Sequence, residues 1–121
     1  MNKEQIEQAK KESIRLHREM WSWLAKTGKD KEDWPEWEWN GGLYGRIMKN
    51  CFLCSYVFEI LKKDIEIRSC RKYCPLKWPD KYCAVSSILT NKQFLFDKWQ
   101  NETDIEKRKE YAETIALLDE K

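Results

Sequence analysis

The sequence predicts a mainly α-helical fold with little β structure, in which helices at both ends of the chain pack around a cysteine-rich middle. Three observations support this prediction: an amphipathic stretch near the start, two helix-capping patterns near the end, and the confinement of all five cysteines to the part between them. A chain of 121 residues has room for one modest hydrophobic core, so we expect a single domain over residues 1–121.

The first predicted helix covers residues 3–26. Apolar or small side chains recur in it at steps of three and four, with charged residues on the opposite face: Ile6, Ala9, Ser13, Leu16, Met20 and Trp23 or Leu24. Gly28 is a suitable stop just beyond it, because glycine readily adopts the left-handed conformation that ends many helices. His17, the only histidine, falls on or beside the apolar stripe, which favours a packed or boundary histidine over a metal ligand or a catalytic base.

A tryptophan-rich segment follows this helix. Because a residue before proline avoids the helical conformation, Trp34-Pro35 predicts a loop or a single helical turn, and the Asn-Gly-Gly of residues 40–42 predicts a turn. From residue 43 to about residue 63 the apolar side chains are dense enough to predict a helix over at least the later part. Residues 65–67 alternate in polarity and predict a very short strand.

Two short patterns predict helix starts near the end of the chain. Thr90-x-x-Gln93 and Thr103-x-x-Glu106 both match the capping box, in which a hydroxyl and a glutamate or glutamine side chain exchange hydrogen bonds with backbone N–H groups. The first pattern opens a predicted short helix and the second a predicted terminal helix. The apolar residues assigned to these two helices are Phe94, Leu95 and Trp99, and then Ile105, Tyr111, Ile115 and Leu118.

The cysteines form a C-x2-C pair, a fifteen-residue gap, a C-x3-C pair and a last cysteine after a further eight residues: Cys51, Cys54, Cys70, Cys74 and Cys83. A structural zinc ion takes four soft ligands in a tetrahedron, and two cysteine pairs about 15 to 20 residues apart are typical of such sites. Cys74 precedes a proline that stiffens its turn, and Cys83 follows a proline-containing loop. We therefore assign Cys51, Cys54, Cys74 and Cys83 as ligands of a structural zinc ion, with Cys70 as a substitute ligand or a free thiol.

Four other interpretations of the cysteines stay open: five buried cysteines acting as small hydrophobic side chains, a thioredoxin-type redox pair, a disulfide framework and an iron–sulfur cluster. The redox pair lacks a surrounding βαβ pattern, and a disulfide framework needs a secretory context that the sequence does not show. Four thiolates suit an iron–sulfur cluster as well as zinc. Around zinc they give a net charge of about −2, which offsets part of the excess of nine Lys and Arg over four Asp and Glu in residues 46–83.

The composition disfavours several classes of function. The formal net charge is +2, which argues against both a protein that wraps nucleic acid and an acidic mimic of nucleic acid. The polar start predicts no signal peptide, and no apolar run approaches the roughly 18 residues that cross a bilayer, so we expect a cytoplasmic protein without a membrane anchor. The chain has one histidine, no phosphate-binding glycine loop and no deaminase H-x-E signature, so we expect a non-enzyme.

The seven tryptophans are too many for so small a core to bury completely. We expect one or two of Trp34, Trp37 and Trp39 to be partly exposed and to anchor an interface with another protein. Acidic residues surround all three, which disfavours bases and phosphates as partners. The alternative is a zinc-finger module that binds nucleic acid through basic residues of the middle, which are Lys62, Lys63, Arg68, Arg71, Lys72, Lys77 and Lys81.

Several spaced motifs occur together in this chain: W-x-W-L at Trp21, D-W-P-x-W-x-W-N-G-G, C-F-x-C at Cys51, C-P-L-x-W-P at Cys74, then Cys83 and a later tryptophan. In this combination, over most of its length, the chain resembles small zinc-binding accessory proteins of phages and prophages of Gram-positive bacteria. The family more often has C-x2-C-P where this chain has C-x3-C-P, a departure that concerns Cys70. The cysteines that match the recurrent ones are Cys51, Cys54, Cys74 and Cys83.

The resemblance carries an implication about function. Small accessory phage proteins of this size often act on the host, and some that contain zinc resemble inhibitors of type II CRISPR systems. The resemblance therefore implies a type II-A anti-CRISPR protein that blocks Cas9 by binding it in the host bacterial cytosol. The near-neutral charge of the chain fits binding to a protein surface better than mimicry of DNA.

Overall fold

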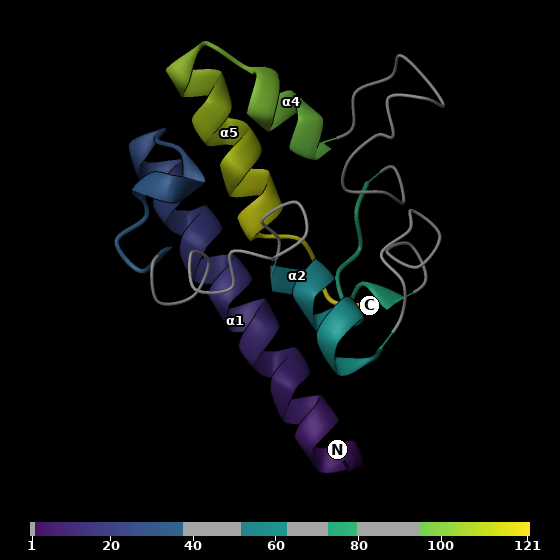
Figure 1. Cartoon of the computed structure of the whole chain (residues 1–121). Helices are drawn as coiled ribbons and strands as arrows, with labels where there is room; N and C mark the ends of the chain where they lie inside the picture. Colours follow the sequence, from purple (N-terminus) through teal and green to yellow (C-terminus); the bar gives the residue numbers. More distant parts are fainter. Residues whose placement is uncertain (1, 38–51, 63–72, 80–94) are drawn as a thin grey trace.

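The computed structural model of the chain describes residues 2–37, 52–62, 73–79 and 95–121, and in these residues the fold is mainly helical (Figure 1). The α-helices are α1 (Lys3–Thr27), α2 (Phe52–Ser55), α4 (Leu95–Asn101) and α5 (Ile105–Ala116). Within the described residues, β pairing is limited to one isolated antiparallel bridge between Leu76 and Glu120. The predicted mainly α fold with little β structure is therefore confirmed for this part of the chain.

Helix α1 begins at the predicted residue, Lys3, and ends at Thr27, one residue beyond the predicted end. The Asn2 side chain accepts a hydrogen bond from the Gln5 backbone N–H at 2.8 Å, and the Gln5 side chain accepts one from the Asn2 N–H at 2.9 Å. The helix ends at Gly28, which has a φ of 71° and donates its N–H to the Leu24 carbonyl. The face turned to the core comprises Ile14, Leu16, His17, Met20, Trp21 and Leu24.

Helix α5 lies alongside α1, so the first and last helices of the chain pack directly against each other (Figure 1). Its N-cap is Asp104, whose carboxylate accepts hydrogen bonds from two N–H groups of the first turn. The predicted start at Thr103 is wrong by one residue, because aspartate caps at least as well as threonine and adds a negative charge at the positive end of the helix. Ile105 is 57% exposed and Leu118 lies beyond the helix end, so neither belongs to a buried helical stripe.

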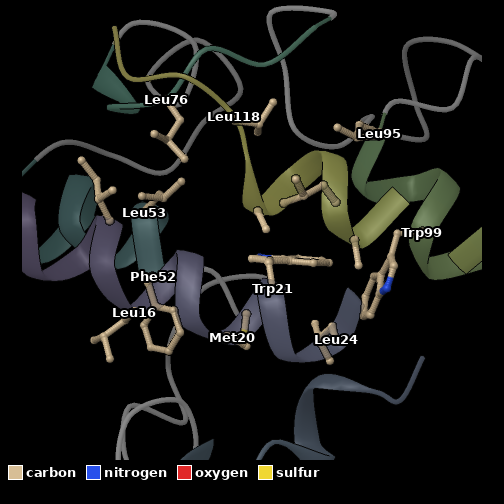
Figure 2. Close-up of a cluster of buried hydrophobic side chains, with 14 of the residues drawn as sticks. Leu16, Met20, Trp21, Leu24, Phe52, Leu53, Leu76, Leu95, Trp99 and Leu118 are labelled. Carbon is tan, nitrogen blue, oxygen red and sulfur yellow. The ribbon is translucent and has the colours of Figure 1, made fainter. Parts of the chain in front are cut away.

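The core lies between α1, α2, α4 and α5. Trp21 points from α1 to the Trp99 ring of α4, with the ring centroids 4.7 Å apart and the planes at 76°, the edge-to-face arrangement that aromatic pairs favour. Figure 2 shows Leu53 and Leu76 toward one end of this cluster, with Leu24 and Trp99 toward the other.

The segments after α1 agree with the prediction where the structure describes them. A single 3₁₀ turn, Lys31–Asp33, precedes Trp34, which has extended backbone angles before Pro35. In the range 43–63 the described residues 52–60 are helical, first as α2 and then as a π-helical turn. Lys62, with a φ of 57°, follows this turn. The predicted strand at 65–67 and the predicted cap at Thr90 lie outside the described residues.

No helix in the described ranges has both the length and the apolar character needed to cross a membrane.

Candidate metal centre and its surroundings

The structure describes the backbone of two of the four predicted zinc ligands and the side chain of one of them, Cys74. Cys54 lies in α2 and Cys74 lies in the segment Tyr73–Pro79, whereas Cys51, Cys83 and the substitute Cys70 fall outside the described residues. Among the residues described, no three His, Cys, Asp or Glu side chains come together in a group that could hold a metal ion. The predicted tetrad therefore stays a prediction from the sequence.

The Cys74 segment is part of the hydrophobic core. Cys74 is 8% exposed, Leu76 is 1% exposed, and the Trp78 ring is buried with them. The backbone of this segment pairs with the end of the chain through two hydrogen bonds of 2.9 Å, from Lys77 N–H to the Asp119 carbonyl and from Lys121 N–H to the Pro75 carbonyl. The segment is thus held by both its side chains and its backbone.

Cys74 has the kind of donor atom that zinc prefers, a cysteine sulfur. Its surroundings are apolar, and apolar surroundings by themselves favour the neutral thiol over the thiolate that binds metal. The buried indole N–H groups of both Trp78 and Trp99 have no hydrogen-bond acceptor among the described residues, so an unpartnered indole does not single out the cysteine segment. If zinc binds, Cys74 would be one of the residues that hold it, and the ion would supply cross-linking of the fold and not chemistry.

His17 joins α1 to α5 at the same end of the core. Its Nε2 lies 3.0 Å from the carbonyl oxygen of Ile115, and since a carbonyl can only accept, Nε2 carries the proton. The pKa of His17 is lowered to about 4, mainly by burial and to a smaller extent by the positive charges of Lys31 and Arg18, while the hydrogen bond to Ile115 acts in the opposite direction. The histidine is therefore neutral at pH 7. The expected packed histidine is confirmed.

Arg18 holds the C-terminal end of α5. Its Nη1 donates to the Ala116 carbonyl at 2.8 Å, and its Nη2 donates to the Leu118 carbonyl at 2.9 Å. The last carbonyls of a helix have no partner within the helix and carry partial negative charge, so a guanidinium satisfies both needs. Next to this contact the Trp78 ring stands edge-on to the His17 ring, with centroids 6.3 Å apart. The end of α5, α1 and the Cys74 segment thus meet at one junction.

A second cluster surrounds a buried lysine at the other end of α1. The Lys31 ammonium, in a residue only 4% exposed, lies 4.4 Å from the ring centroid of Phe96, 5.2 Å from that of Trp21 and 5.9 Å from that of Trp99. Cations are attracted to the faces of aromatic rings, and this attraction strengthens where water is excluded. Lys31 therefore ties the turn after α1 to α4.

Arg108 of α5 contacts the Trp99 ring and the residues that follow α1. Its guanidinium carbon lies 4.4 Å from the Trp99 ring centroid, its Nη1 donates to the Gly28 carbonyl at 3.1 Å, and it forms an ion pair with Asp30. A planar guanidinium can stack on a ring and donate hydrogen bonds in its plane at the same time. Arg108 thus connects α5, α4 and the C-terminal cap of α1.

The three tryptophans predicted as partner anchors differ in their surroundings. Trp34 is 4% exposed and packs edge-to-face on Phe52, so its indole is part of the core and not of the surface. Trp37 is half-buried against that core. Trp39 lies outside the described residues. Of the three, Trp37 is the described tryptophan that keeps an exposed edge.

Sequence reasoning did not identify Arg18, Lys31 and Arg108 as structural residues. Lys31 lies in a run of charged residues, which is typical of a solvated turn, and its aromatic neighbours come partly from α4, more than sixty residues away in the sequence. The available signal was the excess of tryptophans, because the face of an indole attracts basic side chains.

Comparison with models of known protein families, with curated protein sequences and with solved structures gave no match to this chain.

Proposed function

We propose that this chain is a non-enzymatic, zinc-stabilised helical protein that acts by binding another protein, as an anti-CRISPR protein of phage origin that blocks Cas9 in the host cytosol. The zinc ligands in this proposal are Cys51, Cys54, Cys74 and Cys83. The cysteine spacing supports the metal, and the sequence resemblance supports the target.

Three basic side chains are used inside the fold. Arg18 binds the carbonyls at the end of α5, Lys31 lies among aromatic rings, and Arg108 binds Gly28, Asp30 and the Trp99 ring. These three cations are therefore not available to phosphates. Of the basic residues in the zinc-finger alternative, the structure describes Lys62 and Lys77, and both are exposed, so positive charge alone does not decide between the two kinds of partner.

The observation that carries the choice of a protein partner is the surface around Trp37. Glu32, Asp33 and Glu36 are exposed, and the half-buried Trp37 lies next to them in the sequence. A tryptophan edge beside carboxylates suits a partner surface that is basic and partly apolar. Cas9 holds its guide–target duplex in a positively charged channel, so a face of this kind is electrostatically matched to it.

The target is tested by mixing the purified chain with purified Cas9 and guide RNA, measuring complex formation by size-exclusion chromatography and then measuring DNA cleavage. We expect a complex and loss of cleavage. Glu32→Lys should weaken the complex, whereas Glu110→Lys, an equal charge change at an exposed position of α5, should not. Absence of both complex and inhibition would reject Cas9 as the target, and salt-sensitive binding to nucleic acid alone would support the zinc-finger alternative.

The metal is tested separately by elemental analysis with thiol titration under reducing conditions. We expect one zinc ion per chain, and one reactive thiol when zinc is bound. Cys51→Ser should lose the zinc and several kcal/mol of stability, or the fold, because structural zinc binding contributes directly to folding. Cys70→Ser is the matched control and should keep the zinc. Iron in place of zinc would support the cluster alternative, and a Cys51→Ser variant that melts like the parent chain would reject a structural site.

A further inference from the structure

Three aromatic rings surround the ammonium group of Lys31. Its Nζ atom lies over the rings of Phe96, Trp21 and Trp99, at 4.4, 5.2 and 5.9 Å from their respective centroids. The planes of these rings are inclined to one another by angles between 52° and 78°, so the rings form walls around the cation and not a stack. We call Trp21, Phe96 and Trp99 the aromatic box.

The aromatic box is a buried site. Lys31 is 4% exposed, and Trp21 and Trp99 are each 3% exposed. The attraction between a cation and a ring is strongest where water is excluded. Lys29, in contrast, is exposed, and its ammonium lies 6.0 Å from the centroid of the Trp23 ring. Of these two lysines, Lys31 therefore occupies a site of the kind by which proteins recognise alkylammonium ligands.

Lys31 also begins the 3₁₀ turn that leads to the surface around Trp37. The Lys31 carbonyl accepts a hydrogen bond from the Trp34 N–H at 3.0 Å, and the Trp34 carbonyl accepts one from the Trp37 N–H at 2.9 Å. The exposed carboxylates of Glu32 and Asp33 lie on the same turn. The backbone that carries this acidic surface is thus bonded in sequence to the residue whose ammonium lies in the box.

We propose that the aromatic box is a binding site for alkylammonium groups, that Lys31 occupies it from within the chain, and that this covalent tie holds the turn that leads to Trp37 in place. The rings attract the positive charge, and the alkyl stem packs against their apolar surface. Lys31 is then a positioning residue for the acidic surface. The role of that surface in binding a partner rests on the proposed function, whereas the ammonium site does not.

The ammonium site is tested by chemical rescue. Lys31→Ala removes the propylammonium part of the side chain and leaves the three rings. Free propylammonium has the atoms that were removed, and 1-propanol is a neutral molecule of similar shape. We expect propylammonium to raise the midpoint of thermal unfolding of Lys31→Ala. It should bind the variant about tenfold more tightly than 1-propanol, because the alcohol lacks the charge that the rings attract.

Two controls show whether the effect comes from the box. The parent chain should not respond to propylammonium, because Lys31 already occupies the site. Lys29→Ala makes the same change in charge and size two residues away and keeps Lys31 in the box, so it should not respond either. Every titration is made at constant ionic strength, with sodium in place of propylammonium, because salt alone changes interactions between surface charges.

Hydrogen exchange tests whether Lys31 holds the turn. In the parent chain the Asp33 and Trp34 amides are hydrogen-bonded to the carbonyls of Asp30 and Lys31, both at 3.0 Å. We expect these two amides to exchange several times faster in Lys31→Ala than in the parent chain or in Lys29→Ala. Added propylammonium should leave them fast, because a free ligand fills the box without tying the turn to it.

Each outcome decides one part of the proposal. If 1-propanol stabilises Lys31→Ala as well as propylammonium does, or if neither binds the folded variant, the ammonium site is overturned. Unchanged exchange of the Asp33 and Trp34 amides would overturn the tie to the turn. If Lys31→Ala is unfolded, propylammonium must restore its helical circular dichroism and 1-propanol must not. Without such recovery Lys31→Met, which fills the box with no charge, decides: turn amides as slow as in the parent chain would reject the role of the ammonium.

These measurements are independent of the proposed target. If Cas9 does not bind the parent chain, the proposed function is rejected, and the ammonium site still stands or falls by the rescue. If Cas9 binds, Lys31→Ala should bind it several times more weakly than Lys29→Ala, because its acidic turn is no longer held in place. Equal affinities of the two variants for Cas9 would show that Lys31 does not position the partner surface.

Discussion

The Nε2–H of His17 donates a hydrogen bond to the carbonyl oxygen of Ile115, 3.0 Å away, and so joins the middle of α1 to the last turn of α5. This hydrogen bond can form whether the ring is neutral or protonated, because Nε2 carries a proton in both states. What opposes protonation is the burial of the ring beside two positive side chains. The stability of the fold should therefore depend on pH through this residue.

Acid should destabilise the protein through His17. The pKa of His17 is about 4 in the folded chain against 6.5 for a free histidine, so as the pH falls the unfolded state binds the proton first. The stabilisation by the neutral ring is complete above about pH 6.5 and is lost as the pH falls toward 4, by roughly 3 kcal/mol in total. The measurement is the free energy of unfolding in urea from pH 7 to pH 4.

The control for this pH dependence is His17→Gln, whose amide can donate to Ile115 but does not titrate. We expect the variant to be less stable than the parent at pH 7. The difference between their free energies of unfolding should become smaller as the pH falls toward 4. Acid also releases metal from thiolates and protonates carboxylates, but both proteins share those effects. A constant gap over the whole range would show that His17 does not titrate as described.

Arg18→Met should destabilise the protein more than Arg15→Met on the same helix. Arg18 donates two charge-assisted hydrogen bonds to carbonyls at the end of α5, and their loss should cost about 2 kcal/mol. Arg15 pairs with Glu12 and Glu19 on the half-exposed face, where such pairs contribute about 0.5 kcal/mol. Equal midpoints of thermal unfolding for the two variants would contradict the assigned role of Arg18.

Gly28→Ala should destabilise the protein for two separable reasons. Gly28 has a φ of 71°, and a Cβ built on it would lie 2.7 Å from Cγ2 of Ile105. The backbone term costs about 1 kcal/mol, and the steric overlap adds about as much again. In an Ile105→Ala background only the backbone term is left, so the cost of Gly28→Ala should fall by about half. A double-mutant cycle by urea unfolding measures this, and strictly additive costs would refute the steric contribution.

Leu76→Ala should be costly although Leu76 lies outside the helices, in an isolated β-bridge. The side chain is 1% exposed in the core, and truncating such a leucine costs about 3 kcal/mol. Leu117→Ala, at a residue that is 67% exposed, is the matched control and should change stability by less than about 0.5 kcal/mol. If both variants unfold at the same urea concentration, the Cys74 segment is not anchored in the core as described.

Local signals gave reliable predictions. The stripe that includes Leu16 and Met20 and the stop at Gly28 lie within the helix or just beyond it, so α1 could be predicted almost to the residue. The cap of α5 was misplaced by one residue, because Thr103 and Asp104 are both good caps and the choice depends on how the chain enters from α4.

Non-local partners decided what the sequence could not predict. Lys31 is buried because Phe96 and Trp99 of α4 cover its ammonium group, and Trp34 is buried because Phe52 receives it. Nothing near Lys31 or Trp34 in the sequence marks these contacts. The metal site differs in this respect, because its ligands are predicted from the sequence alone, by the spacing of the cysteines. The described residues add how the backbone and side chains next to one of these ligands, Cys74, are held in the core.

The contact between Arg18 and the carbonyl of Leu118 spans 100 residues of sequence, and this separation has a kinetic consequence. A ribosome adds about 5 to 20 residues per second, so α1 leaves it roughly 5 to 20 s before its main packing partner exists. During that interval the face that carries Met20 and Leu24 has no α5 to cover it. Contacts between such distant residues also slow folding after release, because a long loop must close first. We therefore expect nascent α1 to be a binding site for chaperones, with refolding limited by docking of the two terminal helices.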